Sequence, residues 1–198
     1  DGVSLSGGIN VTAGSLKLNE AGTLASTVAM SGGTLDIDET ATVSGALTQS
    51  GNITIDVAAN KTLTYSGTAI GVGANTVTLT GGGTFTSGGI TLDNANSKLL
   101  LNSITLDGTT TSSDSLGIDV DANSTVTTLA IGHVTPVSIA DGVSLSGAIT
   151  VSAGSLKLTE TGTLDSTVSM SGGTLDADET ATVSGVLTQS GNITIDVL

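Results

Sequence analysis

Aspartates recur at alternating positions in matched segments of this chain, and they are the residues best suited to chemistry. Clustered carboxylate oxygens are the ligands that Ca²⁺ prefers in proteins. Neither the glycine-rich nonapeptide GGxGxD of calcium-binding repeats nor an EF-hand loop occurs in the sequence. Six aspartates are nevertheless candidate Ca²⁺ ligands: Asp36, Asp38, Asp56, Asp176, Asp178 and Asp196.

Lysines offer a second interpretation of the same aspartates. Lys17 precedes Asp36 by one repeat, and Lys157 precedes Asp176 in the same way. A solvated acidic face that is partly paired with lysine would need no metal. The sequence therefore leaves two readings open, a calcium site or an ion-paired face, and it predicts no other cofactor.

Catalytic residues are not expected. The only histidine, His133, has Ser138 and Asp141 near it in sequence alone, whereas a Ser-His-Asp arrangement needs a base oriented by a carboxylate. Polysaccharide lyases built on β-helices generally use Lys or Arg beside carboxylates, and this chain has no Arg. We predict that the protein is not an enzyme, and a polysaccharide-active enzyme is the weakest alternative.

The charge balance argues against several partners. Eighteen acidic residues face only four lysines, for a formal net charge of −14. Nucleic-acid binding and docking to anionic membranes both rest on clustered basic residues. No apolar run approaches the roughly 20 residues of a membrane-spanning helix, so direct membrane insertion of this segment is not expected. The absence of cysteine suits an exported chain.

A long internal repeat organises the chain. Residues 1–57 and 141–197 align without a gap at an offset of 140, with 48 of 57 positions identical by direct count. The 140-residue unit divides into seven pieces of about 20 residues. We therefore assign 1–140 as a seven-coil repeat unit and 141–198 as the start of a second copy, continuous with the first.

Each piece carries apolar residues at i and i+2, which is the period of a β-strand. Glycine-rich pairs such as Gly32-Gly33 separate these segments and indicate turns. No stretch shows a helical pattern of useful length. This pattern predicts an all-β fold, a parallel β-helix (β-solenoid) of about ten coils with three short strands each. Variable coil length and the lack of a hexapeptide period favour right-handed winding.

Neither terminus carries a capping helix or a polar closing coil in the pattern. Exposed strand edges template further pairing. We expect the native chain to continue, or its ends to stack on neighbouring copies, and we read the sequence as a mature fragment or a piece of something longer.

Three strings, MSGGTLDID, QSGNITIDVAANKTLTYSG and TVTLTGGGTFTSGGITL, resemble the repeats of bacterial secreted β-helix proteins. Those proteins include autotransporter passengers and filamentous-haemagglutinin-like giant adhesins. The resemblance implies secretion, a place on the bacterial cell surface or outside the cell, and a structural or adhesive role. It carries over no site residues.

From the repeat and this resemblance together we expect a stalk or filament segment that associates with itself, end to end or laterally. The alternative is an adhesin, or a Ca²⁺-stabilised surface-layer or biofilm protein, whose specificity lies outside this segment. Its ligand would lie on a host cell, a neighbouring cell or the matrix.

Overall fold

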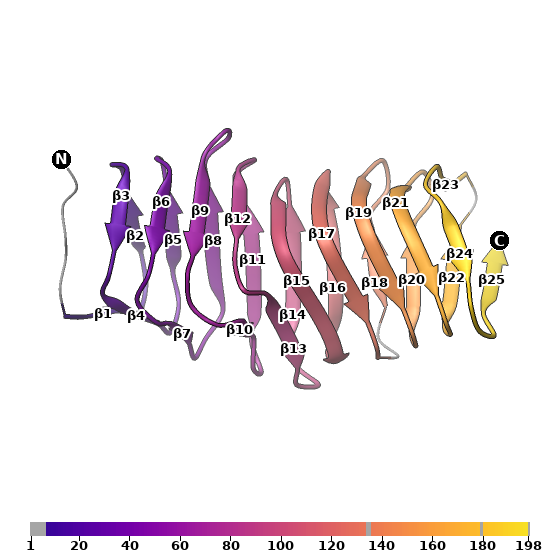
Figure 1. Cartoon of the computed structure of the whole chain (residues 1–198), viewed down its shortest axis with the longest axis horizontal. Coiled ribbons are helices and arrows are strands. Elements are labelled where there is room, and N and C mark those ends of the chain that lie inside the picture. Colours follow the sequence, from indigo (N-terminus) through magenta and orange to yellow (C-terminus); the bar gives the residue numbers. More distant parts are fainter. Residues whose placement is uncertain (1–6, 134–135, 179, 198) are drawn as a thin grey trace.

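The computed structural model describes residues 7–133, 136–178 and 180–197. Every regular element in these ranges is a β-strand, and the strands stack as a solenoid of about ten coils (Figure 1). All paired strands run parallel, so each coil hydrogen-bonds to the coils before and after it. The predicted all-β parallel solenoid is confirmed.

The strands form three sheets that run along the rod. The ten-stranded sheet contains, in order, β2 (Ser15–Leu18), β5 (Thr34–Ile37), β8 (Ile53–Val57), β11 (Thr76–Thr80), β14 (Lys98–Asn102), β16 (Gly117–Ala122), β18 (Val137–Ile139), β20 (Ser155–Leu158), β22 (Thr174–Ala177) and β25 (Thr194–Val197).

The twelve-stranded sheet follows the main order β3 (Gly22–Leu24), β6 (Ala41–Val43), β9 (Thr62–Tyr65), β12 (Thr84–Thr86), β15 (Thr105–Asp114), β17 (Ser124–Ile131), β19 (Ser144–Val151), β21 (Thr163–Met170) and β23 (Thr182–Val183). Attached to it are β10 (Ile70–Gly71), β13 (Ile90–Asp93) and β24 (Leu187–Gln189). The three-stranded sheet contains β1 (Gly8–Val11), β4 (Thr27–Met30) and β7 (Leu47–Gln49).

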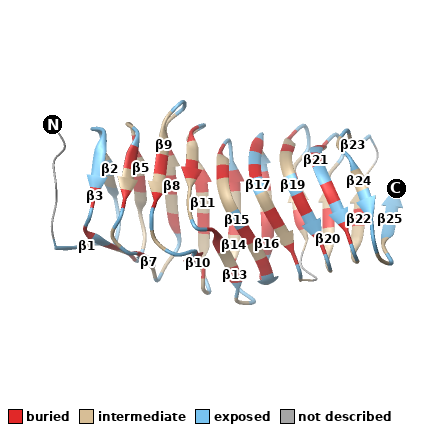
Figure 2. Ribbon diagram, in the orientation of Figure 1, coloured by how far each residue is buried: buried red, intermediate tan, exposed pale blue. Residues whose placement is uncertain are grey.

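The core is a set of apolar columns along the rod, because alternate residues of each strand point inward. One column in the ten-stranded sheet is fully buried on seven successive coils, and neighbouring members are paired in register. Its members are Leu35, Ile55, Leu79, Leu101, Val120, Ile139 and Leu158. Figure 2 shows burial through the middle of the rod and exposure at β3 and β25, near its two ends.

Tight corners between strands depend on glycine at a few positions. Gly33 and its counterpart Gly173 both have φ of +82°. A Cβ on Gly33 would lie 2.4 Å from the carbonyl oxygen of Gly14 on the preceding coil. Only glycine combines this left-handed backbone with such a close approach between coils.

The two copies do not take identical places in the sheet. The inward column that passes through Leu35 contains Leu16 on the preceding coil and reaches Leu158 further along the rod. In the sequence repeat, however, Leu158 corresponds to Leu18 and not to Leu16. The second copy is thus displaced by two residues in the ten-stranded sheet. Because the displacement is even, every inward side chain stays inward.

Candidate functional site

The candidate site of the first copy is an outward column on β2, β5 and β8. Lys17, Asp36 and Asp56 occupy successive positions of this column, since their strands pair in register. The Nζ of Lys17 lies 3.1 Å from Oδ2 of Asp36 and 2.7 Å from Oδ2 of Asp38. The hydrogen bonds that the ammonium group of Lys17 donates to Asp38 and then to Asp36 raise the pKa of Lys17, so this ammonium group is the counter-ion of two carboxylates.

The second copy rebuilds the same arrangement on β20 and β22. The Nζ of Lys157 lies 3.1 Å from Oδ2 of Asp178 and 3.4 Å from Oδ2 of Asp176. The hydrogen bond to Asp178 is the main cause of the raised pKa of Lys157. The Oδ1 atoms of Asp176 and Asp178 are sheltered from solvent and accept no hydrogen bond from the described residues. Asp196 follows Asp176 in register on β25.

Asp56 shows what happens where two carboxylates are stacked on neighbouring coils. Its pKa is raised, first by partial burial and then by repulsion from Asp36 and Asp38, while Lys17 acts in the opposite direction. Asp56 pairs on its other side with Thr80 of β11, which carries no charge. In this column, Asp56 is thus the acid that forms no ion pair with a lysine among the described residues.

The two remaining lysines also contact acids one coil away. The Nζ of Lys61 lies 2.6 Å from Oε2 of Glu39 on the preceding coil, and the Nζ of Lys98 lies 2.6 Å from Oδ2 of Asp119 on the following coil. All four lysines of the chain thus form ion pairs between adjacent coils. The lysine pairings predicted for Asp36 and Asp176 are confirmed; the other two were not foreseen.

The six calcium candidates are gathered in two groups, one for each copy, and lysine sits between two carboxylates in both. In the part of the chain that the structure describes, no group of three or more His, Cys, Asp or Glu side chains is placed to hold a metal ion. The arrangement supports the ion-paired reading of Asp36, Asp38, Asp176 and Asp178. Calcium binding stays a prediction, which a melting experiment addresses below.

His133 has a partner that the sequence did not indicate. Its Nε2 lies 3.3 Å from Oδ1 of Asp114, at the end of β15 on the preceding coil. Ser138 lies on β18, in register between Asp119 and Lys157. His133 therefore lies beside Asp114, whereas Ser138 lies between Asp119 and Lys157 in the ten-stranded sheet.

Asp141 stabilises a corner between two coils. Its carboxylate accepts hydrogen bonds from the hydroxyl and, at 3.2 Å, the amide of Thr161. The hydroxyl hydrogen bond is the largest cause of the lowered pKa of Asp141. This geometry is that of a structural link rather than of a group that orients a catalytic base.

Threonines form two outward columns on the twelve-stranded sheet. One column runs through Thr62, Thr84, Thr105 and Thr125 on four successive coils. A neighbouring column runs through Thr23, Thr42, Thr64 and Thr86. It ends at Asp107, whose carboxylate accepts hydrogen bonds from the hydroxyls of Thr86 at 3.3 Å and Thr127 at 2.9 Å.

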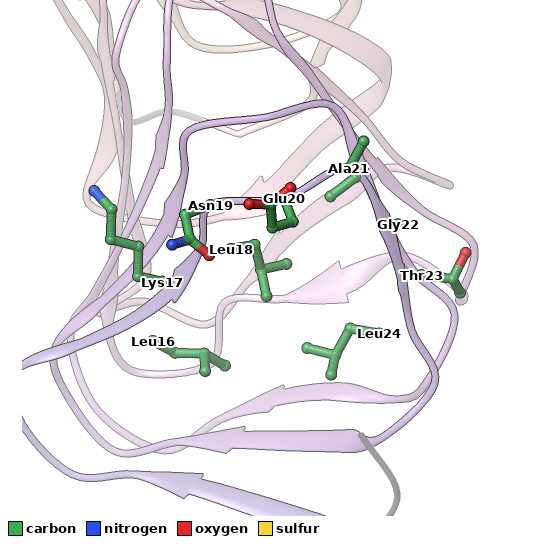
Figure 3. Close-up of a pocket in the computed structure, with 10 residues that line it drawn as sticks. Leu16, Lys17, Leu18, Asn19, Glu20, Ala21, Gly22, Thr23 and Leu24 are labelled. Carbon is green, nitrogen blue, oxygen red and sulfur yellow. The ribbon is translucent and has the colours of Figure 1, made fainter. Parts of the chain in front are cut away.

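One hollow of about 260 Å³ lies beside the first coils (Figure 3). Leu16, Leu18 and Leu24 line it together with Lys17 and Glu20. The counterparts of the three leucines in the second copy, at 156, 158 and 164, are fully buried. The hollow is thus lined by residues of the apolar core that no further described coil covers, and it is not a cleft toward which several titratable groups converge.

Comparison with known proteins gives no relative: no family model, no curated protein and no solved structure matches the chain. Among the described residues there is also no helix long and apolar enough to span a membrane.

Proposed function

We propose that this chain is a structural and adhesive repeat segment of a secreted bacterial surface protein or extracellular filament. The observation that supports it most is the ten-stranded parallel sheet, which passes from the first copy into the second without a break. Repeats that continue one sheet can lengthen a rod by simple addition, because each coil contacts only its neighbours. Among the described residues, the candidate site contributes ion pairs between adjacent coils, which suit a rod under tension better than a catalytic centre.

The cell surface or the extracellular space is the proposed location. The cysteine-free composition and the resemblance of the repeats to secreted β-helix proteins support it. Self-association is the proposed interaction, and a ligand on a host cell, a neighbouring cell or the matrix is the secondary one. The acidic surface supports neither nucleic acid nor anionic membrane as a partner.

Electron microscopy of the full-length native protein tests the structural role. We expect stalks or fibres whose thickness matches one solenoid. Compact particles without an elongated part would overturn the proposal. Binding of the isolated segment to cells or glycans tests the adhesive alternative, and strong binding by this segment would move adhesion into first place.

Calcium stabilisation is a second candidate role, favoured by the sheltered and unbonded Oδ1 atoms of Asp176 and Asp178. Thermal unfolding of the chain is followed with excess Ca²⁺, with excess Mg²⁺ and with a chelator. If calcium bound here, the transition would rise with Ca²⁺ alone, and Asp178→Asn would remove the rise. Because Lys157 already binds both carboxylates at the position that a metal ion would take, we expect the three curves to coincide; a calcium-specific rise that Asp178→Asn abolishes would contradict this.

A further inference from the structure

One face of the rod has a single break among the described strands. The third coil comprises β7, β8 and β9, and the fourth comprises β10, β11 and β12 (Figure 1). β7 pairs with β4 on the second coil and β10 pairs with β13 on the fifth, but β7 and β10 do not pair with each other. On the other two faces, β8 with β11 and β9 with β12 close this boundary. Two ladders therefore hold a boundary whose neighbours on either side have three.

Two side chains occupy the place of the missing ladder. The backbone amide of Leu47 on β7 donates a hydrogen bond to the hydroxyl of Tyr65 at 3.2 Å. The Nε2 of Gln49 crosses the boundary and donates to the carbonyl oxygens of Gly71 at 3.2 Å and Val72 at 2.7 Å. Backbone groups inside a protein need partners, and here side chains supply partners that a neighbouring strand supplies on other coils.

This replacement leaves one polar atom unsatisfied. The Oε1 of Gln49 is buried and accepts no hydrogen bond from the described residues. A buried acceptor without a partner costs free energy, whereas each bond of a complete ladder satisfies a donor and an acceptor together. The boundary between the third and fourth coils therefore combines fewer backbone hydrogen bonds with a destabilising polar group.

Tyr65 restricts this feature to one coil. It is the only tyrosine of the chain, and it is 6% exposed at an inward position in register with Val43. A Cβ on Gly67 would collide with the hydroxyl of Tyr65, so glycine is needed where the chain turns from β9 toward β10. The break thus depends on particular residues of the third coil and lies away from both ends of the described rod.

We propose that the boundary between the third and fourth coils is a joint, at which the rod opens before the two neighbouring boundaries do. The inference rests on the structural role proposed above, because a joint matters in a rod under tension. Tension along the rod loads the hydrogen bonds between coils, and at the joint two ladders bear what three bear on either side. Opening there leaves the coils on each side stacked, so the rod yields at one place without unravelling.

Native-state amide exchange tests the joint at three threonine amides in similar hydrogen bonds. The amide of Thr84 donates across the joint at 2.9 Å. The amide of Thr54 donates across the preceding boundary at 3.0 Å, and that of Thr105 across the following boundary at 3.0 Å. Thr84 should exchange about tenfold faster than the other two, because local opening exposes its amide first. Equal rates at the three amides would overturn the joint.

A disulfide staple gives a second test, and the cysteine-free chain allows it without background. Thr54 and Thr78 pair in register across the joint, and Thr34 and Thr54 pair across the preceding boundary. Adjacent strands lie about 4.8 Å apart, within the span that a disulfide bridges. Oxidation of the Thr54→Cys, Thr78→Cys chain should slow exchange at Thr84 to the rate of Thr105. Oxidation of the control chain, Thr34→Cys with Thr54→Cys, should leave the Thr84 amide fast, and equal slowing by both staples would contradict a local joint.

Substitutions of the two bridging residues test their part in the joint. Gln49→Met removes the donor across the boundary, and Tyr65→Phe removes only the hydroxyl that Leu47 binds. Each should speed exchange at Thr84 by about two- to tenfold, the net effect of a hydrogen bond. Met30→Leu, in register with Gln49 on the preceding coil, is the control and should leave that rate unchanged. Circular dichroism confirms that each variant is folded, and an unchanged rate in both bridging variants would overturn their role.

The failure of this inference can be told from failure of the proposed function. Equal exchange at the three boundaries would remove the joint, yet stalks of the full-length protein in electron microscopy would still support the structural role. Compact full-length particles would remove the structural role itself, whatever the exchange rates in this chain.

Discussion

The last strand of the 57-residue repeat has different neighbours in the two copies. In the first copy, β8 lies between β5 and β11, and Ile55 and Val57 are fully buried. In the second copy, β25 pairs with β22 alone among the described strands, and Ile195 and Val197 are mostly exposed. The local sequence, ITIDV, is the same in both places. Burial in this molecule is therefore a property of the adjacent coil.

At the start of the repeat, the second copy is the one that a described neighbouring coil covers, and the first copy is not. A Cβ on Gly7 would contact none of the described residues, whereas a Cβ on Gly147 would collide with the carbonyl oxygen of Val126. Similarly, Leu156 is fully buried beside Val137, and Leu16 is not. Each copy thus serves as the internal control for the other, and substitutions at matched positions separate the effect of a residue from that of its neighbours.

The largest expected difference lies between Ile55→Ala and Ile195→Ala. Removing the Ile55 side chain leaves a cavity among Leu35, Leu79 and the rest of the buried column, which should cost about 2–5 kcal/mol. The exposed side chain of Ile195 should cost less than about 1 kcal/mol in the monomer. Urea unfolding of both variants, measured at a concentration where the chain is monomeric, checks this.

Amide exchange sharpens the same comparison, since a solenoid need not unfold in one step. Ile55→Ala should speed exchange in β5, β8 and β11, and Ile195→Ala only in β22 and β25. Equal destabilisation by the two substitutions would contradict the view that the following coil determines burial.

The solenoid fold could be predicted because each coil repeats one short-range pattern. Apolar residues two apart, interrupted by glycine pairs, specify inward columns without knowledge of any distant contact. The pairs Lys17–Asp36 and Lys157–Asp176 also followed from sequence, because those coils are 19 residues apart and the strands pair without a shift. Distances of 3.1 and 3.4 Å confirm them.

Other features depend on coil length, which the sequence pattern leaves open. Lys61 and Glu39 are 22 residues apart, so their contact is visible only when the register of β6 and β9 is known. The two-residue displacement of the second copy arises in the same way, from the sum of unequal coils. The long strands β15 and β17 are also unforeseen: each continues through a shift in pairing instead of ending at the corner.

The second-largest expected difference in folding stability is the one between the variants Gly147→Ala and Gly7→Ala. Both glycines have positive φ, +126° and +105°, so an alanine is strained at either position. At Gly147 the new Cβ would also collide with the carbonyl oxygen of Val126, and the coils would have to separate locally. We expect a loss of about 3 kcal/mol at Gly147 and about 1 kcal/mol at Gly7.

Urea unfolding under the same conditions measures both glycine variants. An additional Gly33→Ala variant extends the test, because its Cβ would meet the carbonyl oxygen of Gly14 inside the first copy. It should resemble Gly147→Ala rather than Gly7→Ala. A Gly7→Ala variant as unstable as Gly147→Ala would show that backbone strain, and not the neighbouring coil, dominates.

The smallest effect concerns Asp56, which is stacked between Asp36 on one side and the uncharged Thr80 on the other. Its pKa is raised in the folded state, so the carboxyl binds its proton more tightly in the folded chain than in the unfolded chain. Ionisation of this carboxyl therefore costs more free energy in the folded chain than in the unfolded chain. The protein loses stability as the pH rises through the folded-state pKa of Asp56, and the full cost is present above it. Asp56→Asn removes the penalty. The variant should be more stable than the unmodified chain at pH 7, and this gain should be smaller at pH 3. We expect the gain at pH 7 to be a fraction of the free energy that Ile55→Ala removes.

Lys17 provides the second arm of this test, because its charge opposes the rise in the pKa of Asp56. In a Lys17→Met background the penalty should grow, and Asp56→Asn should then stabilise the chain more than it does alone. Asp196→Asn serves as the matched control, because this aspartate occupies the same place in the repeat and is exposed on the last described coil. If Asp56→Asn and Asp196→Asn respond alike to pH, the stacked acid of the first copy carries no special cost. A larger response at Asp56 would show that a covering coil raises the cost of unpaired charge, just as it buries the apolar residues beside it.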